Sequence, residues 1–408
     1  MTVAEQARSW IAELIERAGR FDAEHGGPPW LRALRRTGRE RLAAGGLPLA
    51  RDEAWTYTNV RPLLAQRFQD ADGHAGETAE TGWQPLALVD RPPVTAVSDF
   101  PQNAFTAMNQ AFARSGFNVT VHAGESRFIE IVHRRHLRDD GGALYADAVR
   151  VELAPGARAT VVERWEPADR SADAPHVAAA TLHVPGSELV IAPGAALRYY
   201  RLADDDPKAF GFGSLRAAVG ADAELDLALI GGGMAIDRTE VTVALLAGGA
   251  RARLGGAAVL SGPAHGAIHT CVQHRAPECS SDQLFKTVLL DGARSAFQGT
   301  IEVDRVAQGT DAFQLSNTLL LHPDSRADAR PQLRIGADQV RCTHGATSGP
   351  LAPEQLHYLQ CRGLPRSTAT AILVRGFLDE VNRRIEVPGV EAALQAQLDR
   401  GLATLEAA

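Results

Sequence analysis

The first 65 residues carry apolar side chains at the spacing of an amphipathic helix. Apolar residues recur every three or four positions from Val3 to Ala18, which places them on one helix face. Gly26-Gly27-Pro28-Pro29 breaks the pattern, Trp30, Leu31 and Leu34 resume it, and Gly45-Gly46 ends it. We therefore expect an N-terminal region that is helical.

An aromatic segment, Arg51-Asp52-Glu53-Ala54-Trp55-Thr56-Tyr57-Thr58, follows these helices. Its simplest role is to pack the helices onto the next part of the chain, and nothing in it demands catalysis. From Gln69 to Gly82 the chain is acidic and rich in Gly, Ala and Thr, with little to bury. That composition predicts a mobile surface connection.

From about Phe100 the apolar period shortens to two, the period of a half-buried β-strand. Turn phrases such as Pro155-Gly156-Ala157, Pro193-Gly194-Ala195 and Asp291-Gly292-Ala293 recur along this region. The alternating runs include Val119–Val121, Phe128–Val132, Val149–Leu153, Thr160–Trp165, Thr181–Val184, Glu188–Ile191, Leu197–Leu202, Leu225–Ile230, Glu240–Leu246 and Ala257–Leu260. The series predicts many short strands joined by similar corners.

The strand series also narrows the fold class. No convincing ten-residue helical pattern interrupts it, which disfavours a doubly wound α/β fold. A β-sandwich would show similar strands, but the length of the series and its Gly/Ala-rich corners favour a β-helix, or solenoid, of stacked coils. We expect a mainly β fold. Because a solenoid has exposed strand edges at its two ends, helices or a partner's sheet should cover them.

The C-terminal tail supplies candidate helices. Pro353 and Pro365 suit the first turns of two helices, and Gly363 suits the stop between them. In the second helix, apolar residues fall at three-to-four spacing from Ala369 to Ile385, and a last apolar line follows Pro388. These stripes pack on each other, on the solenoid, or in a helix-in-groove contact with a partner. The pattern alone leaves these alternatives open.

The stretch Pro331–Pro350, PQLRIGADQVRCTHGATSGP, holds the most suggestive pair of side chains. On a strand, Cys342 and His344 point to one face and Thr343 to the other. A thiolate and an imidazole are good donors for iron or zinc, but two ligands do not complete a tetrahedral site. Any metal here needs further ligands from elsewhere in the chain or from a second protein. The alternative is a half-buried Cys beside a surface His.

The amino-acid composition argues against several classes of protein. Hydrophobic residues make up 45% of the 408 residues and charged residues 22%, as in soluble globular proteins. A net charge of -7 argues against bulk binding of nucleic acid or of anionic membranes. No run is long enough for a membrane span, and the N-terminus lacks a signal-peptide layout. Four cysteines in so long a chain do not form a disulfide framework, so a reducing cytoplasm is expected.

Other candidate sites are weaker. His265, His269, Cys271 and His274 crowd one strand-like run, with Cys279 beyond, but their spacing matches no standard zinc pattern and solvated surface histidines are the commoner outcome. The sequence contains no phosphate-binding loop and no G-x-S-x-G elbow. A carbohydrate-active β-helix enzyme would need carboxylates and basic residues clustered on one face, which the pattern does not show. We therefore expect a protein that is not an enzyme.

Several segments resemble the SufD family of the SUF iron–sulfur cluster assembly machinery. They read HRAPECSSDQLFKTVLL from His274, then FQGTIEV, QGTDAFQLSNTLLL, PQLRIGADQVRCTHGAT and LAPEQLHYLQCRGL. The resemblance covers roughly residues 249–385, and the W-x-Y-T element at Trp55 is a second, distant anchor. Its implied fold is a right-handed parallel β-helix with helical regions at both ends. The corresponding domains are residues 1–100, a β-helix core at 101–348, and a helical region at 349–408.

The resemblance also implies partners and a site. Members of the SufD family pair with SufB through β-helix ends and bind the ATPase SufC through C-terminal helices. A transient iron–sulfur cluster assembles at the SufB junction, with ligands from both subunits, and ATP enters only through SufC. The matching metal positions here are His344, the stronger candidate, and Cys342. The positions expected to contact SufC are Leu356, Ile372, Leu373 and Phe377.

The resemblance has departures, and alternatives stay open. SufB-like chains carry H-E-A-T where this chain has His344-Gly345-Ala346-Thr347, so that acidic ligand is absent. Cys279 matches a frequent family cysteine of unassigned role, whereas Cys271 and Cys361 are incidental. The chain could also be purely architectural, with no metal role. In isolation it could form a homodimer through the edge that otherwise receives SufB.

Overall fold

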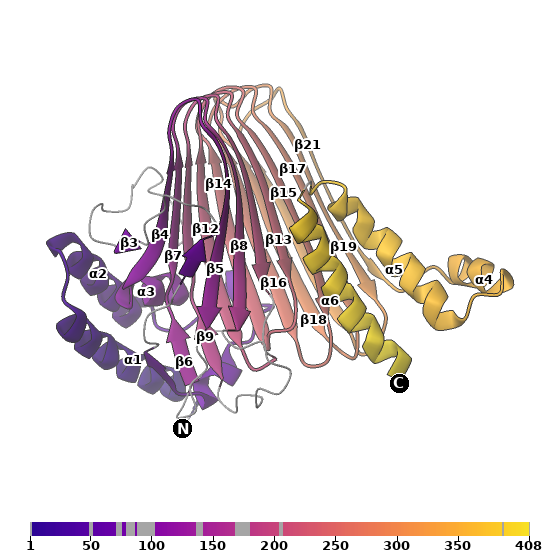
Figure 1. The fold of residues 1–408 in the computed structure, drawn as a ribbon, viewed down its shortest axis with the longest axis horizontal. Helices are drawn as coiled ribbons and strands as arrows, with labels where there is room; N and C mark the ends of the chain where they lie inside the picture. Colours follow the sequence, from indigo (N-terminus) through magenta and orange to yellow (C-terminus); the bar gives the residue numbers. More distant parts are fainter. Residues whose placement is uncertain are drawn as a thin grey trace.

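A computed structural model describes residues 2–48, 52–70, 76–78, 86–87, 103–135, 142–167, 180–203, 207–385 and 387–407. Its core is a parallel β-solenoid built from two facing sheets, as the strand periodicity predicts (Figure 1). From Gly186 onward, successive strands alternate between the two sheets, so each coil adds one strand to each sheet. The expected connection at Gln69–Gly82 lies mostly outside the described residues.

We call the two sheets sheet A and sheet B. Sheet A contains β3 (Leu86–Ala87), β4 (Ser115–Val121), β7 (Ala148–Leu153), β10 (Gly186–Ile191), β12 (Phe210–Val219), β14 (Ile236–Leu245), β16 (His265–His274), β18 (Arg294–Val303) and β20 (Arg326–Ile335), with β1 (Phe68–Asp70), β6 (Gly142–Tyr145) and β9 (Thr181–His183) paired alongside. Sheet B contains β2 (Gly76–Thr78), β5 (Ser126–Arg135), β8 (Arg158–Pro167), β11 (Ala196–Ala203), β13 (Glu224–Gly231), β15 (Arg251–Leu260), β17 (Ser280–Leu289), β19 (Asp311–Leu320) and β21 (Arg341–Gly349).

The recurring turn phrases form corners that stack from coil to coil. At several corners a residue with positive φ donates its backbone N–H to the next coil: Gly194 to the Ala221 carbonyl at 2.8 Å, and Asp222 to the Gly248 carbonyl at 3.0 Å. Glycine adopts this conformation without a Cβ clash. The strand alternation fills the space between the sheets with aliphatic side chains, among them Leu227, Val243 and Leu254.

The N-terminal helices pack on the outer face of sheet A. α1 (Val3–His25) and α2 (Pro29–Gly45) confirm the predicted helical region, and η1 (Glu53–Trp55) and η2 (Arg61–Ala65) follow. The apolar faces of these helices share one core with Phe210 and Phe212 of β12. The sequence did not predict α3 (Ala104–Ala111), because eight residues are too few for a clear helical period. α3 docks through Phe105, whose ring stacks 3.7 Å from that of Phe212.

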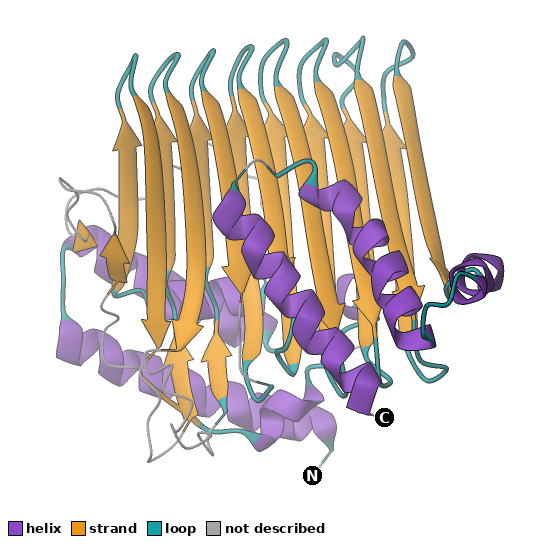
Figure 2. Cartoon of the chain, turned by 45° about the vertical axis from the view of Figure 1, so that its right-hand side comes forward, coloured by secondary structure: helices purple, strands orange, loops and turns teal. Residues whose placement is uncertain are grey.

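The C-terminal helices cover the opposite sheet. α5 (Arg366–Asn382) and α6 (Pro388–Ala407) lie on the outer face of sheet B, where Val374 and Leu378 join a core with Leu284 and Val288 (Figure 2). α4 (Pro353–Cys361) projects beyond the last coil in both views (Figures 1 and 2). Gly363, with φ of 86°, separates α4 from α5, as predicted.

The two ends of the solenoid differ. At the N-terminal end, short antiparallel strands close the sheets, β3 against β4 and β2 against β5. At the other end, β20 and β21 each pair on one side only among the described strands, and neither contains a buried residue. We call this terminal coil, β20 and β21, the open end. The C-terminal tail was expected to cover one end of the solenoid, but α5 and α6 lie on the outer face of sheet B instead, and among the described residues nothing covers this edge.

Candidate functional site

Cys342 and His344 both lie on β21 at the open end. Their register partners on β19, Ala312 and Gln314, are buried between the sheets, so the row of side chains that contains Cys342 and His344 faces the solenoid interior. The intervening Thr343 continues the outward row of Phe313. His344 is nevertheless exposed and Cys342 half-buried, because no further coil covers them. As predicted, Cys342 and His344 lie on the same face of the strand, and both side chains are accessible to solvent at least in part.

The environment of Cys342 keeps its thiol protonated. Partial burial, assisted by the carboxylate of Asp311, raises the pKa of the Cys342 thiol. The side chain packs at the edge of a small apolar cluster with Val340 and Leu333. A metal ion that bound Cys342 would have to displace the thiol proton.

The described residues do not complete a metal site by themselves. They contain no group of three or more His, Cys, Asp or Glu side chains able to hold a metal ion. Cys342 and His344 therefore stand as a pair without a third candidate ligand among the described residues. Additional ligands would have to come from a surface that meets the open end.

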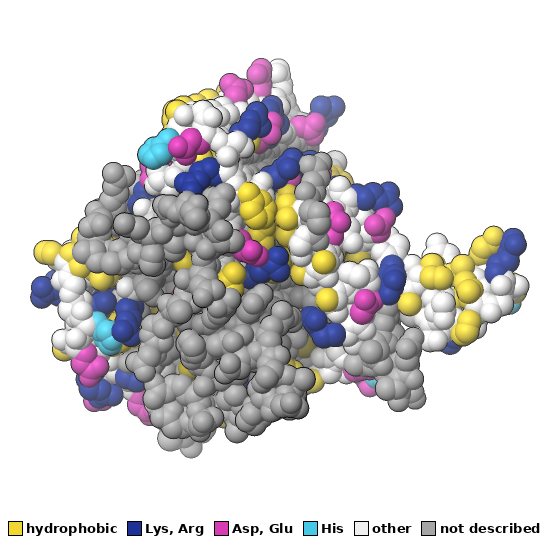
Figure 3. Space-filling view, viewed as in Figure 1, with side chains coloured by type: hydrophobic (Ala, Val, Ile, Leu, Met, Phe, Trp, Pro, Cys, Tyr) yellow, Lys and Arg dark blue, Asp and Glu magenta, His cyan; other side chains and the backbone are white. Residues whose placement is uncertain are grey.

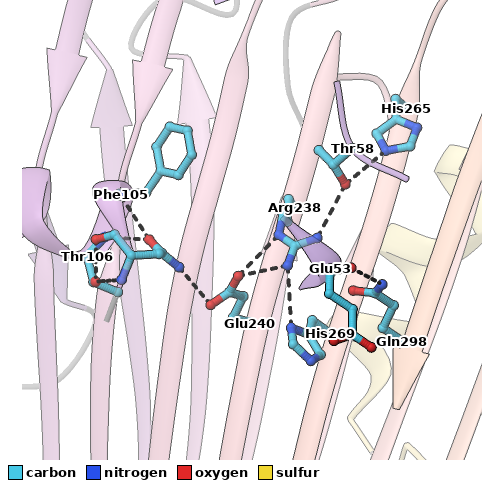
Figure 4. Close-up of polar contacts among 10 residues, drawn as sticks. Glu53, Thr58, Phe105, Thr106, Arg238, Glu240, His265, His269 and Gln298 are labelled. Carbon is cyan, nitrogen blue, oxygen red and sulfur yellow. Dashed lines mark hydrogen bonds and ion pairs between the residues drawn. The ribbon is translucent and has the colours of Figure 1, made fainter. Parts of the chain in front are cut away.

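The histidine-rich strand β16 serves a structural role. His265 and His269 lie on the outer face of sheet A beside the aromatic segment, where Thr58 contacts Arg238 at 3.3 Å and His265 at 3.4 Å (Figure 4). Arg238 also bonds Glu240 at 2.8 Å. Burial lowers the pKa of both imidazoles, that of His265 to about 4. The expectation of solvated surface histidines is wrong, because the N-terminal segment partly covers His265 and His269, and His274 is buried with its Nε2 2.9 Å from the Ser281 hydroxyl.

The other three cysteines differ in burial and in their contacts. Burial raises the pKa of Cys271 to about 12, so it stays a thiol at neutral pH. Cys279 is buried and donates to the Ala247 carbonyl at 3.2 Å. Cys361 is exposed on α4, with its Sγ 3.4 Å from Nε2 of His357. All four cysteines are free.

The residues predicted to contact SufC divide into two groups. Ile372 is 44% exposed on α5, and Leu373 is half-buried. Leu356 is buried, and Phe377 packs against sheet B, where Lys286 Nζ lies 4.5 Å from its ring centroid. Hydrophobic side chains also gather on the projecting arm that carries α4, where Tyr358 is 58% exposed (Figure 3). Only part of the predicted set is therefore available at the surface.

A charged groove on the outer face of sheet B was missed by the sequence reasoning. Arg251 meets Glu224 at 2.5 Å and Arg253 meets Asp226 at 2.8 Å, each pair joining neighbouring coils. The sequence did contain a signal for these pairs. In each pair the acidic and the basic residue are 27 positions apart, which places them opposite each other on neighbouring coils. Glu224 and Asp226 each pair with an arginine of the neighbouring coil. These carboxylates are therefore not free to act as the catalytic pair of a glycosidase.

A buried ionic cluster near the other end was also not foreseen. Glu163 accepts hydrogen bonds from Arg201 at 2.8 Å and Tyr199 at 2.5 Å, and it contacts His133 at 3.0 Å. Burial by itself would raise the pKa of Glu163, but Arg201, His133 and Tyr199 together lower it to about 2. All four side chains are buried. The cluster links coils and is closed to a substrate.

The fold defines a parallel β-solenoid protein with an uncovered terminal coil. The family described as "SUF system FeS cluster assembly, SufBD core domain" matches residues 136–377. The chain belongs to this family, and its SUF iron–sulfur cluster assembly context is therefore established. Within the described residues, none of the helices has the length and apolar character needed to cross a bilayer.

Individual relatives point the same way. The chain is 27% identical to the iron–sulfur cluster assembly protein SufD of Escherichia coli (strain K12) over 401 residues, covering 89% of this chain and 91% of that protein. It is 27% identical to a SufBD family protein of Mycobacterium tuberculosis, covering 88% and 90%. A shorter match, 35% identical over 28% of this chain and 26% of the relative, is to SufD of Bacillus subtilis. The chain is thus of the SufD type.

Proposed function

We propose that this chain is a non-enzymatic scaffold subunit that pairs with SufB through the open end and binds the ATPase SufC through its C-terminal helices. The nascent iron–sulfur cluster is the cargo, built at the SufB seam with His344 and Cys342 as this chain's ligands. The four free thiols fit a reducing cytoplasm as its location.

The single observation that carries the proposal is the position of His344. His344 is exposed on the terminal strand β21, although its side chain belongs to the row that faces the solenoid interior and is buried in the preceding coil at Gln314. A second solenoid stacked on β20 and β21 would pair the free strand edges and cover this row. Exposed Ile335, on the inward row of β20, would lose its water contact in the same step. The site then becomes a closed seam with ligands from two chains.

The chemistry of the pair suits a transient cluster. A neutral imidazole donates a nitrogen lone pair to iron near pH 7. Cys342 binds only as a thiolate, so metal loading releases its proton. This chain would supply one nitrogen and one sulfur ligand to the cluster. The remaining coordination positions of the iron ions would be filled by SufB and by inorganic sulfide. Such shared ligation favours release once the seam opens.

The connection to SufC runs through α5. Val374 and Leu378 pack on β17, and Arg384 bonds Asp282 of β17 at 2.8 Å. β17 is separated from β21 by β19 alone in sheet B. A displacement of α4 and α5 by two approaching SufC copies would therefore act on strands close to the open end. This is how ATP binding on SufC would open the seam.

The test of the cluster site uses the complex of this chain with SufB and SufC. We expect His344→Ala to leave fold and complex intact and to abolish iron and sulfide build-up on the purified complex, followed by visible absorption. Thr343→Ala, on the outward row beside it, is the matched control and should retain build-up. A His344→Ala complex that accumulates cluster at the wild-type rate overturns the assignment and leaves an architectural subunit.

The partner surfaces have separate tests. Ile335→Asp places a charge at the open end, so we expect loss of SufB, or of a homodimer of the isolated chain, in size-exclusion chromatography. Ile372→Asp should weaken SufC co-purification. It is a cleaner test than Phe377→Ala plus Leu373→Ala, because Phe377 also packs on the solenoid. Retained binding in these variants would contradict the assigned surfaces.

A further inference from the structure

One row of side chains inside the solenoid changes from apolar to polar as it approaches His344. Leu227, Leu254, Gln283, Gln314 and His344 stand in register on β13, β15, β17, β19 and β21. The first four are buried. Along these five positions, the polar side chains are the three nearest the open end. A buried polar side chain in a core position calls for a partner that explains it.

Gln283 has such a partner for its amide oxygen, although its Nε2 has none among the described residues, whereas Gln314 has none for either amide atom. The Gln283 amide oxygen accepts a hydrogen bond from the Thr270 hydroxyl at 2.7 Å. Neither amide atom of Gln314 has a hydrogen-bond partner among the described residues, although the side chain is fully buried. An unpaired amide in such a position is costly, which indicates that a further group completes it.

The direction of the Gln314 amide is also defined. Its Nε2 lies over Gly299 of β18, so close that a Cβ at Gly299 would stand 1.8 Å from it. The glycine leaves the space that the amide occupies. With Nε2 directed across the core to β18, Oε1 is the atom left to meet a group on a neighbouring coil. The register neighbour of Gln314 on the open side is His344, one strand spacing of about 4.8 Å away.

We propose that Gln314 is a positioning residue for His344: its Oε1 accepts a hydrogen bond from one imidazole N–H, which directs the other ring nitrogen out of the open end as a metal ligand. The inference rests on the proposed function, in which His344 binds the cluster. A metal-binding histidine commonly donates its second ring N–H to such an acceptor, which sets tautomer and orientation. The bond forms when a partner solenoid covers the row and removes the water around His344.

The test measures Co²⁺ binding to the assembled complex with SufB and SufC, through the visible absorption of the bound ion, across a pH series. We expect Gln314→Leu to weaken Co²⁺ binding about 10- to 100-fold. Gln314→Glu keeps an acceptor and should retain binding. Its negative charge should raise the pKa of His344, so the midpoint pH for Co²⁺ binding moves upward by about one unit.

Gln283→Leu is the matched control, one coil deeper and bonded to Thr270. It should leave both the affinity and the midpoint pH unchanged. A purely structural role of Gln314 would alter the melting temperature of the Leu variant without moving Co²⁺ affinity or midpoint, and that result overturns the inference.

The two proposals fail in different ways. Retained Co²⁺ binding and cluster build-up in His344→Ala refute the proposed function itself. Loss in His344→Ala together with wild-type Co²⁺ affinity and midpoint in both Gln314 variants refutes only the positioning role.

Discussion

Lys286 ties the solenoid to α5 through Phe377. Its Nζ donates to the Phe377 carbonyl at 2.9 Å, lies 4.5 Å from the centroid of the same ring, and pairs with Glu380 at 2.5 Å. The ammonium group is buried under the helix. This contact is a polar link between the sheet and the helix proposed to bind SufC.

Removing that ammonium should loosen α5. We expect Lys286→Met to lower the free energy of unfolding by about 2 kcal/mol, because hydrogen bonds to charged groups contribute in this range. Urea unfolding gives the stability, and limited proteolysis shows whether the C-terminal helices open first. The matched control is Arg366→Met, at an exposed position of the same helix, which should change little. Equal effects of the two substitutions would contradict the proposed link.

Trp55 holds the N-terminal segment on sheet A. The indole is buried, and the Arg238 guanidinium carbon lies 4.0 Å from its centroid. We expect Trp55→Ala to destabilise the protein by about 3–5 kcal/mol, as large-to-small core substitutions of Trp do. Arg61→Ala, a nearby exposed position, should be close to neutral in thermal unfolding. A melting temperature unchanged by Trp55→Ala would mean that the segment is not part of the folded core.

Asp237 makes stability depend on pH. It lines a cavity of about 90 Å³ between the sheets, and burial, opposed by Arg201, raises the pKa of its carboxyl to about 6. A carboxyl whose folded pKa exceeds its unfolded value costs stability as pH rises from about 4 to 6. Above pH 6 the cost is complete.

Replacing this carboxyl with an amide should remove the cost. Asp237→Asn is expected to stabilise the protein by up to about 3 kcal/mol at pH 7.5 and by nearly nothing at pH 4 or below. Asp324→Asn, at an exposed carboxyl, serves as the control. Denaturant unfolding at a series of pH values gives the difference, and a difference independent of pH would refute this account.

Glu278 occupies a corner position that suits glycine. Its φ is 56°, and its N–H donates to the Gln308 carbonyl at 2.8 Å. Since a residue with a Cβ pays about 1 kcal/mol in this conformation, Glu278→Gly should raise stability by roughly that amount. Arg305→Gly, at an exposed corner position with ordinary φ, should lower it instead. Thermal unfolding of the two variants gives the signs.

Several features followed from the sequence because they depend on local periodicity. The period-two runs from Val119 to Leu260 became strands, and the Gly-containing phrases became stacked corners. The alternation alone placed Cys342 and His344 on one face. The division into residues 1–100, 101–348 and 349–408 and the assignment of metal and SufC contacts remain predictions.

Other features required the register between coils, which no local pattern specifies. Only the stacking of β19 on β21 places Gln314 behind His344, because these residues are 30 positions apart and one strand spacing apart in space. Likewise, the helical pattern of α5 does not specify which way Phe377 faces. In the structure it packs toward sheet B, because Lys286 and the apolar side chains of β15 and β17 lie beneath it. The sequence by itself determined the strands, corners and paired ligands. The tertiary structure decided which end stays open, because burial depends on what lies in the next coil.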